Sequence, residues 1–382
     1  MYDYLIVGAG MFGATFARLA RDAGKRCLVI DKRPHIDGNC YTNDTEGIQV
    51  HVYGPHIFHC NDKRIWDFVN RFTTFNNFRN APVAMHGGQA YSLPFNMYTF
   101  NQMWGVTSPS EAMAKIESQK LILDRPPENL EEQALVLVGR DIYEKLIRDY
   151  TKKQWQKDPK DLPASIIRRL PVRFTWDNNY FNDSYQGIPT NGYSAMFEAM
   201  LEGTEVKLNV DYFADRSMWH AKAKRVIFSG KIDEYFDLRF GELEYRTLEF
   251  QTEILPVENY QGNAVINYTE SDVPWTRIIE HKHFEPGNKA PHTVVTREIP
   301  AAWSKDKVPY YPIGDERNMR VFEQYSELAQ EEKNVLFGGR LSEYRYYDMH
   351  QVIGSAMALA KRELSAATAP ISATTAKTSV LV

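Results

Sequence analysis

Hydrophobic residues at the start of the chain form two short continuous runs separated by a helical pattern. Leu5-Ile6-Val7 and Cys27-Leu28-Val29-Ile30 contain no polar residue, and runs of this length predict fully buried strands. Between them, apolar residues recur at helical spacing, which predicts a helix over 14–24. The order strand, helix and strand predicts a βαβ unit.

The turn after the first strand is rich in glycine. Gly8, Gly10 and Gly13 have the GxGxxG spacing, and Asp31 ends the second strand. In such a turn the first glycine permits the tight bend, the second admits a pyrophosphate, and the third lets the helix lie close to the sheet. The N–H groups at the start of the helix then bind the pyrophosphate, and the carboxylate accepts hydrogen bonds from the ribose hydroxyls. The pattern predicts a dinucleotide site, with a tight turn in another α/β protein as the alternative.

The middle of the chain changes from strand to helix signals. An apolar stripe predicts a helix over 62–75, and alternation around residues 83–91 predicts a hairpin turning at Gly87-Gly88. Ser108-Pro109-Ser110-Glu111 is a capping box that starts a helix, and helical patterns follow over 130–138 and 141–155. These helices predict an inserted helical domain. Residues 161–185, rich in Arg, Pro and Asn, predict a loop that could close as a lid.

The last half of the chain returns to strands. A helix over 192–203 and short strands over 206–210 and 226–229 predict that the first domain resumes, whereas alternation within 231–310 predicts an antiparallel sheet. The strand at 335–337 ends in glycines, and a helix follows through 353–364. A helix N-terminus directed at the cofactor suits a flavin better than a nicotinamide, because its dipole stabilises a reduced isoalloxazine.

These elements predict an α/β protein, with a Rossmann-like FAD-binding domain, an inserted helical domain and an antiparallel sheet domain. The expected ranges are 1–75, 192–232 and 332–364 for the FAD-binding domain, 97–190 for the helical substrate domain with a mobile loop, 76–96 and 233–331 for the sheet domain, and 365–382 for a disordered tail.

Composition narrows the class of partner and compartment. Among 382 residues, 43% are hydrophobic and 25% are charged, as in globular proteins, and the net charge of −4 gives no reason to expect nucleic-acid binding. An anionic ligand must therefore meet a local group of arginines. Three cysteines without metal-ligand spacing predict reduced thiols and a cytoplasmic protein, and we expect neither a signal peptide nor a membrane span.

Two features of the chain have competing interpretations. His56 and His59 are three residues apart, but no carboxylate stands at matching spacing, so we predict no metal site and expect His56 to lie against a cofactor ring. Trp155 ends the helix over 141–155 among polar residues; it is either a core residue or a stacking surface at a cleft.

Several long segments resemble the bacterial UDP-galactopyranose mutase family. They are VGAGMFG at 7–13, YGPHIFH at 53–59, YTKKQW at 150–155, RLPVRFTWDNNYFNDSYQGIP at 169–189, GKIDEYFDLRFGELEYR at 230–246, TRIIEHKHFE at 276–285, YYPIGDERN at 310–318 and GRLSEYRYYDM at 339–349. The resemblance implies a flavin-dependent isomerase that interconverts UDP-galactopyranose and UDP-galactofuranose without net redox change. N5 of reduced FAD would attack the anomeric carbon, and the product would supply galactofuranose for surface glycans.

The resemblance also implies which residues act. The catalytic group would be Arg169, Arg277, His56 and Arg340, with Arg169 on the mobile loop. Substrate contacts would come from Asn80, Tyr150, Thr151, Trp155, Tyr180, Arg246, Asn267, Tyr311 and Tyr346. FAD would be held by Gly8, Gly10, Phe12, Gly13, Asp31, Lys32, Gly38, Asn39, His56, Ile57, Gly339, Arg340, Asp348 and Met349. An external reductant, NAD(P)H, and a homodimer are further implications.

The chain departs from the family pattern at two places. Leu146 and Ile147 stand where aromatic residues often precede the YTKKQW segment, and His350-Gln351 follow Asp348 and Met349. Two other functions share the cofactor domain. A flavin amine oxidase or desaturase predicts net oxidation and an apolar pocket, and a non-catalytic dinucleotide sensor leaves the polar aromatic residues of the inserted domain unexplained.

Overall fold

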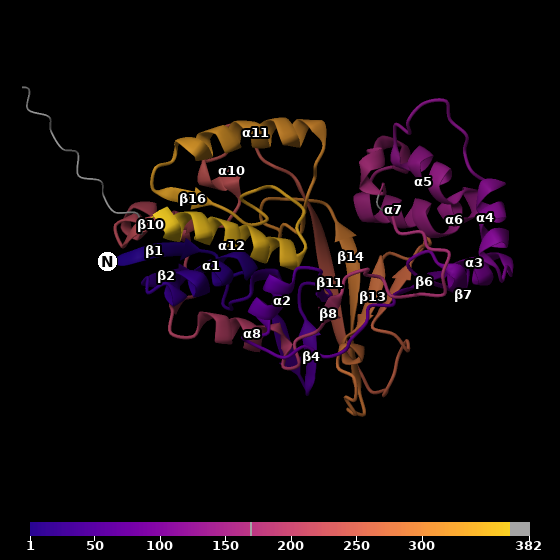
Figure 1. The fold of residues 1–382 in the computed structure, drawn as a ribbon, viewed down its shortest axis with the longest axis horizontal. Coiled ribbons are helices and arrows are strands. Elements are labelled where there is room, and N and C mark those ends of the chain that lie inside the picture. The colour runs from indigo at the N-terminus through magenta and orange to yellow at the C-terminus, as the bar shows by residue number, and fades with distance from the viewer. Residues whose placement is uncertain (169, 367–382) are drawn as a thin grey trace, which may run out of the picture.

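The structure is a computed structural model that describes residues 1–168 and 170–366. Figure 1 shows three regions in a row. A parallel sheet with its helices lies at one end, long strands of a second sheet run through the middle, and a group of helices lies at the other end. The predictions for Arg169 and for the tail beyond residue 366 fall outside the described residues, whereas Ser365 and Ala366 still belong to the last helix.

The parallel sheet has five strands in the order β16-β10-β1-β2-β9. Their bounds are β1 Tyr2–Val7, β2 Cys27–Ile30, β9 Glu205–Lys207, β10 Ala223–Phe228 and β16 Val335–Phe337. Three stretches that lie far apart in the sequence therefore form one sheet. This confirms that the chain returns twice to its first domain, as the short strands predict.

Side chains of the parallel sheet alternate between two cores. Tyr4 and Ile6 pack with α1 (Met11–Asp22), α8 (Gly192–Leu201) and α12 (Met349–Ala366), whereas Leu5 packs on the other face with Tyr212 and Trp219. Because both faces of the central strands are covered, Leu5, Ile6 and all four residues of β2 are buried, as their continuous apolar runs predict. The other helices around this sheet are α2 Lys63–Val69, α9 Arg216–His220, α10 Ile232–Tyr235 and α11 Glu316–Glu331.

The second sheet has seven strands in the order β15-β11-β14-β13-β12-β6-β7. Their bounds are β6 Val83–His86, β7 Gln89–Ser92, β11 Tyr245–Leu255, β12 Val265–Tyr268, β13 Arg277–Glu280, β14 Thr293–Ala301 and β15 Tyr311–Pro312. The hairpin of β6 and β7 turns at Gly87-Gly88 as predicted. The prediction of a wholly antiparallel sheet is wrong at one pair, because β6 joins β12 in parallel.

The inserted region is helical, as predicted. It comprises α3 Met97–Trp104, α4 Pro109–Glu117, α5 Leu130–Val138, α6 Arg140–Ile142, a π-helical turn Tyr143–Ile147 and α7 Arg148–Trp155. Ser108 forms the predicted capping box with Glu111. The pattern missed α3, which starts at Asn96 with a capping box of its own to Thr99.

Smaller elements connect these regions. The strands are β3 Thr42–Thr45, β4 Ile48–His51, β5 Phe58–Cys60 and β8 Tyr185–Gly187, and 3₁₀ turns occupy Gly38–Cys40, Pro159–Asp161, Ala164–Ile166, Tyr212–Ala214 and His281–Phe284. The helix predicted over 62–75 is too long, because α2 ends at Val69. The chain then leaves the helix to pair with a distant segment, where the Thr190 N–H donates to Thr74 O at 2.9 Å.

Candidate active site

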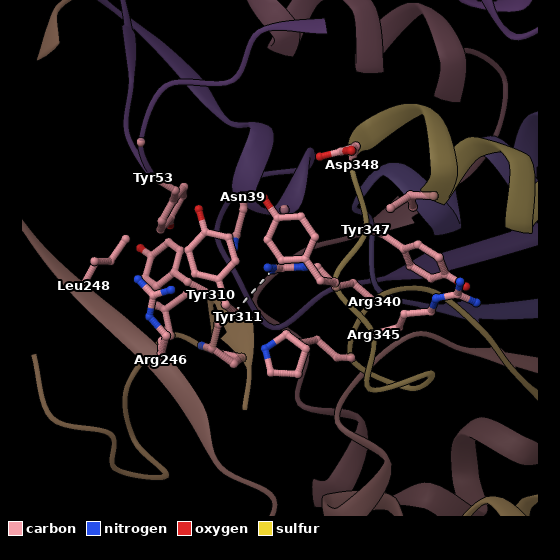
Figure 2. Close-up of a pocket in the computed structure, with 18 of the residues that line it drawn as sticks. Asn39, Tyr53, Arg246, Leu248, Tyr310, Tyr311, Arg340, Arg345, Tyr347 and Asp348 are labelled. Atoms are coloured by element: carbon pink, nitrogen blue, oxygen red, sulfur yellow. Dashed lines mark hydrogen bonds between the residues drawn. The ribbon is translucent and has the colours of Figure 1, made fainter. Parts of the chain in front are cut away.

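One large cleft joins the three regions, with a volume of about 2150 Å³. Its walls come from the glycine turn after β1, from α7, from strands β11 to β13 and from the segment before α12. Figure 2 shows part of this cleft, where Arg246 and Tyr311 lie side by side with Arg340 next to them. This volume exceeds that of ordinary ligand pockets, so the cleft has room for a dinucleotide at one end and a second ligand at the other.

The glycine turn is built for close backbone approach. Gly8 has φ of +108°, and a Cβ on Gly13 would lie 2.0 Å from the Gly8 carbonyl oxygen, so the helix rests directly on the turn. A Cβ on Gly10 would lie 3.7 Å from the Cα of Gly38, which places the second glycine-bearing loop against the first. No side chain of the described residues caps α1, so its first N–H groups are available to an anion.

Asp31 lies in the cleft with both carboxylate oxygens already engaged. Ala9 N–H donates to Oδ2 at 2.8 Å, and Arg33 N–H donates to Oδ1 at 2.9 Å. The sequence predicts a role toward ribose hydroxyls only. The structure adds that Asp31 ties the glycine turn to the end of β2, and each oxygen keeps a further lone pair for a ligand.

Two basic groups, Arg340 and His56, line the same cleft as the glycine turn and the tyrosines. Arg340 donates to Pro309 O at 3.3 Å, and the described residues give it no carboxylate partner; burial lowers its pKa. The ring of His56 contacts Gly54 O through Nδ1 at 2.8 Å, and burial lowers its pKa to about 4. His56 is therefore neutral at pH 7, while Arg340 is a buried cation that an anionic group can neutralise.

Arg277 is held by a buried carboxylate. Its Nε and Nη2 donate to Glu298 Oε2 at 2.8 and 2.7 Å, and the Glu298 side chain is only 3% exposed. Burial opposes the charge of Arg277, but Glu298 outweighs it and raises the pKa above the ordinary value. β13 and β14 position the pair by register, because Arg277 faces Glu298 across the ladder. The remaining N–H groups of Arg277 face the cleft that it lines.

Arg246 contrasts with Arg277 because its buried N–H groups lack partners. Among the described residues nothing accepts a hydrogen bond from its Nε or Nη2, and burial lowers its pKa. Its guanidinium lies 4.3 Å from the ring centre of Trp155 and 5.1 Å from that of Tyr311. Unpaired buried donors are costly, so this arrangement calls for an anionic acceptor in the cleft.

Four tyrosines surround these arginines. Tyr311 and Tyr346 stack with ring centres 5.4 Å apart, and Tyr150 and Tyr180 line the same cleft. Burial raises the pKa of Tyr150 to about 12 and also raises that of Tyr180 and Tyr346. The hydroxyls of these three therefore stay protonated at neutral pH and can donate hydrogen bonds.

Most of the residues singled out in the sequence meet in this cleft. The described ones that line it are Gly8, Gly10, Phe12, Asp31, Lys32, Gly38, Asn39, His56, Ile57, Asn80, Tyr150, Trp155, Tyr180, Arg246, Asn267, Arg277, Tyr311, Gly339, Arg340, Tyr346, Asp348 and Met349. Gly13 and Thr151 do not: Gly13 packs under the turn, and Thr151 is buried within the helical region. The core interpretation of Trp155 is incomplete, because its ring faces the cleft and Arg246.

Sequence reasoning missed Glu298, which does not line the cleft, and the grouping of His59 with Asp348 and His350. Glu298 lies in β14 with no motif around it, and only its cross-strand register to Arg277 reveals it. His59, Asp348 and His350 bring their ligand atoms within 4.8 Å of one another, although the histidines lie in distant segments. The expectation that the protein has no metal site therefore stays a prediction.

The comparisons with known proteins agree with this geometry. The family profile of UDP-galactopyranose mutase matches residues 145–346, and that of an NAD(P)-binding Rossmann-like domain matches residues 6–72. A probable UDP-galactopyranose mutase of Klebsiella pneumoniae is 41% identical, with 95% of each chain covered. The chain belongs to the UDP-galactopyranose mutase family.

A second relative is named for another nucleotide sugar. A dTDP-fucopyranose mutase of Escherichia coli is 40% identical over 94% of this chain and 98% of its own length. Among solved structures, a reduced UDP-galactopyranose mutase has a TM-score of 0.73 at 14% identity, covering 97% of this chain and 95% of that one. A putative protoporphyrinogen oxidase from Exiguobacterium has a TM-score of 0.63 at 12% identity, which shows the shared fold.

Membership in the UDP-galactopyranose mutase family makes the protein a flavin-dependent isomerase, with FAD as its cofactor. The cleft fits FAD on two observations. The uncapped N-terminus of α1 beside the Gly10 and Gly38 backbones can receive a diphosphate. Arg340, buried without a carboxylate partner among the described residues, can offset negative charge on a flavin ring. In the described part of the chain, no helix combines the length and apolar character needed to cross a bilayer.

Proposed function

We propose that this protein interconverts UDP-galactopyranose and UDP-galactofuranose. The observation that carries the proposal is the pair of arginines in one cleft with the dinucleotide-binding turn. Arg246 keeps two buried N–H groups without an acceptor among the described residues, and Arg277 is held in place by Glu298. Two guanidinium groups in a half-closed site are suited to the diphosphate of a nucleotide sugar. An apolar amine or lipid substrate would leave the buried N–H groups of Arg246 without an acceptor.

In this proposal the cleft residues bind the substrate and the cofactor and stabilise the charges that develop on them. When bound and reduced, FAD supplies the nucleophile for the anomeric carbon. Arg277 and Arg246 would hold the diphosphate and stabilise the charge that grows as the sugar separates from UDP. Protonated Tyr150 and Tyr180 would donate to the same oxygens, because their raised pKa values keep them neutral. Neutral His56 would pack against the flavin ring, and Arg340 would favour its anionic reduced form.

Arg169 belongs to this proposal through the resemblance alone. It would join Arg277 at the diphosphate from the loop over 161–185. Asn80, Asn267, Tyr311 and Tyr346 would complete the contacts with the substrate, and all four line the cleft.

The reductant, the oligomeric state and the compartment of the enzyme are also proposals. The reductant is an external one, NAD(P)H, and the protein forms a homodimer, as the resemblance implies. Three buried, free cysteines are typical of a reducing compartment, so we propose a cytoplasmic enzyme whose product feeds surface glycans.

An anaerobic assay tests the function. The dithionite-reduced protein is incubated with UDP-galactofuranose, and products are separated by chromatography, with dTDP-fucopyranose in a parallel reaction. We expect UDP-galactopyranose to form only with reduced flavin, and faster turnover of the UDP-sugar than of the dTDP-sugar. Preference for the dTDP-sugar would reassign the substrate. Absence of sugar turnover here, together with oxygen consumption by the oxidised protein and an amine in a separate aerobic assay, would instead support the oxidase.

Trp155→Ala tests the stacking surface at the substrate end. Loss of the indole removes a surface for a uracil ring and one of the two rings that contact Arg246, so UDP affinity should fall by about 1–3 kcal/mol. Isothermal titration with UDP measures the effect. Tyr98→Ala is the control, because Tyr98 is an aromatic residue of α3 in the same helical region, is 42% exposed and does not line the cleft. Equal UDP affinity in both variants would show that Trp155 serves core packing and does not stack on the ligand.

A further inference from the structure

The ammonium group of Lys153 donates hydrogen bonds to three backbone carbonyls of the second sheet's β12–β13 segment. Its Nζ donates to Tyr268 O at 2.7 Å, to Val273 O at 3.0 Å and to Trp275 O at 3.0 Å. An ammonium has three N–H donors, so these contacts use all of them. The three acceptors converge on one point, which fixes the position of Nζ more closely than a single ion pair would.

The bonded carbonyls lie in the turn that joins β12 and β13. This turn is flanked by Asn267 and Arg277, which face each other across the two strands and both line the cleft. Lys153 itself lies on α7, the helix that brings Tyr150 and Trp155 into the helical part of the cleft wall. The three hydrogen bonds therefore connect the two walls of the substrate end of the cleft.

The charge of Lys153 is not balanced by an ion pair. Within the residues that the structure describes, Lys153 forms no salt bridge; burial lowers its pKa to about 8, and Glu270, Asp272 and Asp149 nearby oppose that shift. The ammonium form dominates at pH 7. Because all three N–H groups donate to carbonyls and none to a carboxylate, the main consequence of this arrangement is a fixed position of Nζ.

We propose that Lys153 is a positioning residue, which sets the distance between the wall of Tyr150 and Trp155 and the wall of Asn267 and Arg277. Both walls can then bind one nucleotide diphosphate at the same time. Because the ligand is the one in the proposed function, this inference rests on that function. Lys153 does not line the cleft, so it acts through its neighbours and not by touching the substrate.

Lys153→Met tests the proposal against Lys152→Met, which removes an exposed charge from the adjacent position of α7. The full-length FAD-bound proteins are compared by titration with UDP at pH 7 and by steady-state kinetics. We expect Lys153→Met to raise the Kd for UDP and the KM for the UDP-sugar at least tenfold, with a smaller change in kcat. FAD content should equal that of Lys152→Met, because the bonds of Lys153 hold the β12–β13 segment and not the glycine turn after β1.

The pH profile provides a readout that packing alone would not change. Between pH 7 and 9, Lys153 loses a proton and with it one of three donors, so UDP affinity of Lys152→Met should weaken across this range. That of Lys153→Met should stay level. A lower melting temperature with unchanged UDP affinity, or parallel pH profiles in the two variants, would overturn the positioning role. Absence of UDP binding in the unmodified protein would instead contradict the proposed function.

Discussion

Replacing Arg277 with alanine is expected to lower kcat/KM for the UDP-sugar by a factor that corresponds to about 2–4 kcal/mol of transition-state stabilisation. This loss is typical of one charge-stabilising donor at a reacting centre. The charge on UDP increases as it separates from the sugar, so the effect should appear in kcat as well as in KM. Steady-state assays with reduced enzyme measure both. Turnover close to that of the unmodified protein would remove Arg277 from the site.

A loss of stability must be separated from this loss of catalysis. Without Arg277, the Glu298 carboxylate is buried and unpaired, and breaking a buried ion pair in this way costs about 3–5 kcal/mol. The double variant Arg277→Ala with Glu298→Gln removes the unpaired charge. We expect it to recover much of the melting temperature and none of the activity. Recovery of activity together with stability would show that Arg277 serves folding only.

Substitution of Gly13 by alanine is expected to remove FAD from the protein. The new methyl group would lie 2.0 Å from the Gly8 carbonyl oxygen and 3.1 Å from Ile6 Cγ2. The closest contact is with backbone, so α1 must move away from the turn that receives the diphosphate. Overpacking of this kind costs about 3 kcal/mol. The flavin absorbance of the purified protein and its melting temperature measure the two effects.

Gly354→Ala is the matched control for Gly13→Ala. Gly354 lies in α12, and its new methyl group would meet only Ile65 Cδ1, at 3.6 Å, which is an ordinary contact. Alanine also has the higher helix propensity, so this variant should keep its FAD and its stability. Normal FAD content in Gly13→Ala would contradict the role of the close approach between helix and turn.

Local patterns in the sequence predict the elements whose stability is decided locally. The continuous apolar runs of β1 and β2, the capping box at Ser108 and the glycine pair at 87–88 each determine a short stretch, and the structure agrees at all of them. Pairings between distant segments are different. The early end of α2 and the parallel pair of β6 with β12 depend on partners more than a hundred residues away, so no local pattern predicts them.

The candidate site divides in the same way. The sequence predicts site residues that lie in motifs, such as Gly10 and Trp155, because the neighbouring residues of the motif indicate their role. Glu298 lies outside the quoted motifs, and Lys153 lies within YTKKQW, where the motif does not indicate its role. Their importance comes from a cross-strand position and from three distant carbonyls. Their roles follow from three-dimensional geometry, which a single sequence does not contain.

The strand order of the parallel sheet has a consequence for biosynthesis. β16 and α12 come from the last part of the described chain, yet β16 extends the sheet at β10 and α12 covers α1. A nascent chain that has emerged only as far as the helical insertion would expose the apolar side of α1 to the ribosome surface and to chaperones. The nucleotide-binding unit is therefore expected to mature only after translation has passed α12, and premature termination before that point should yield an aggregating fragment.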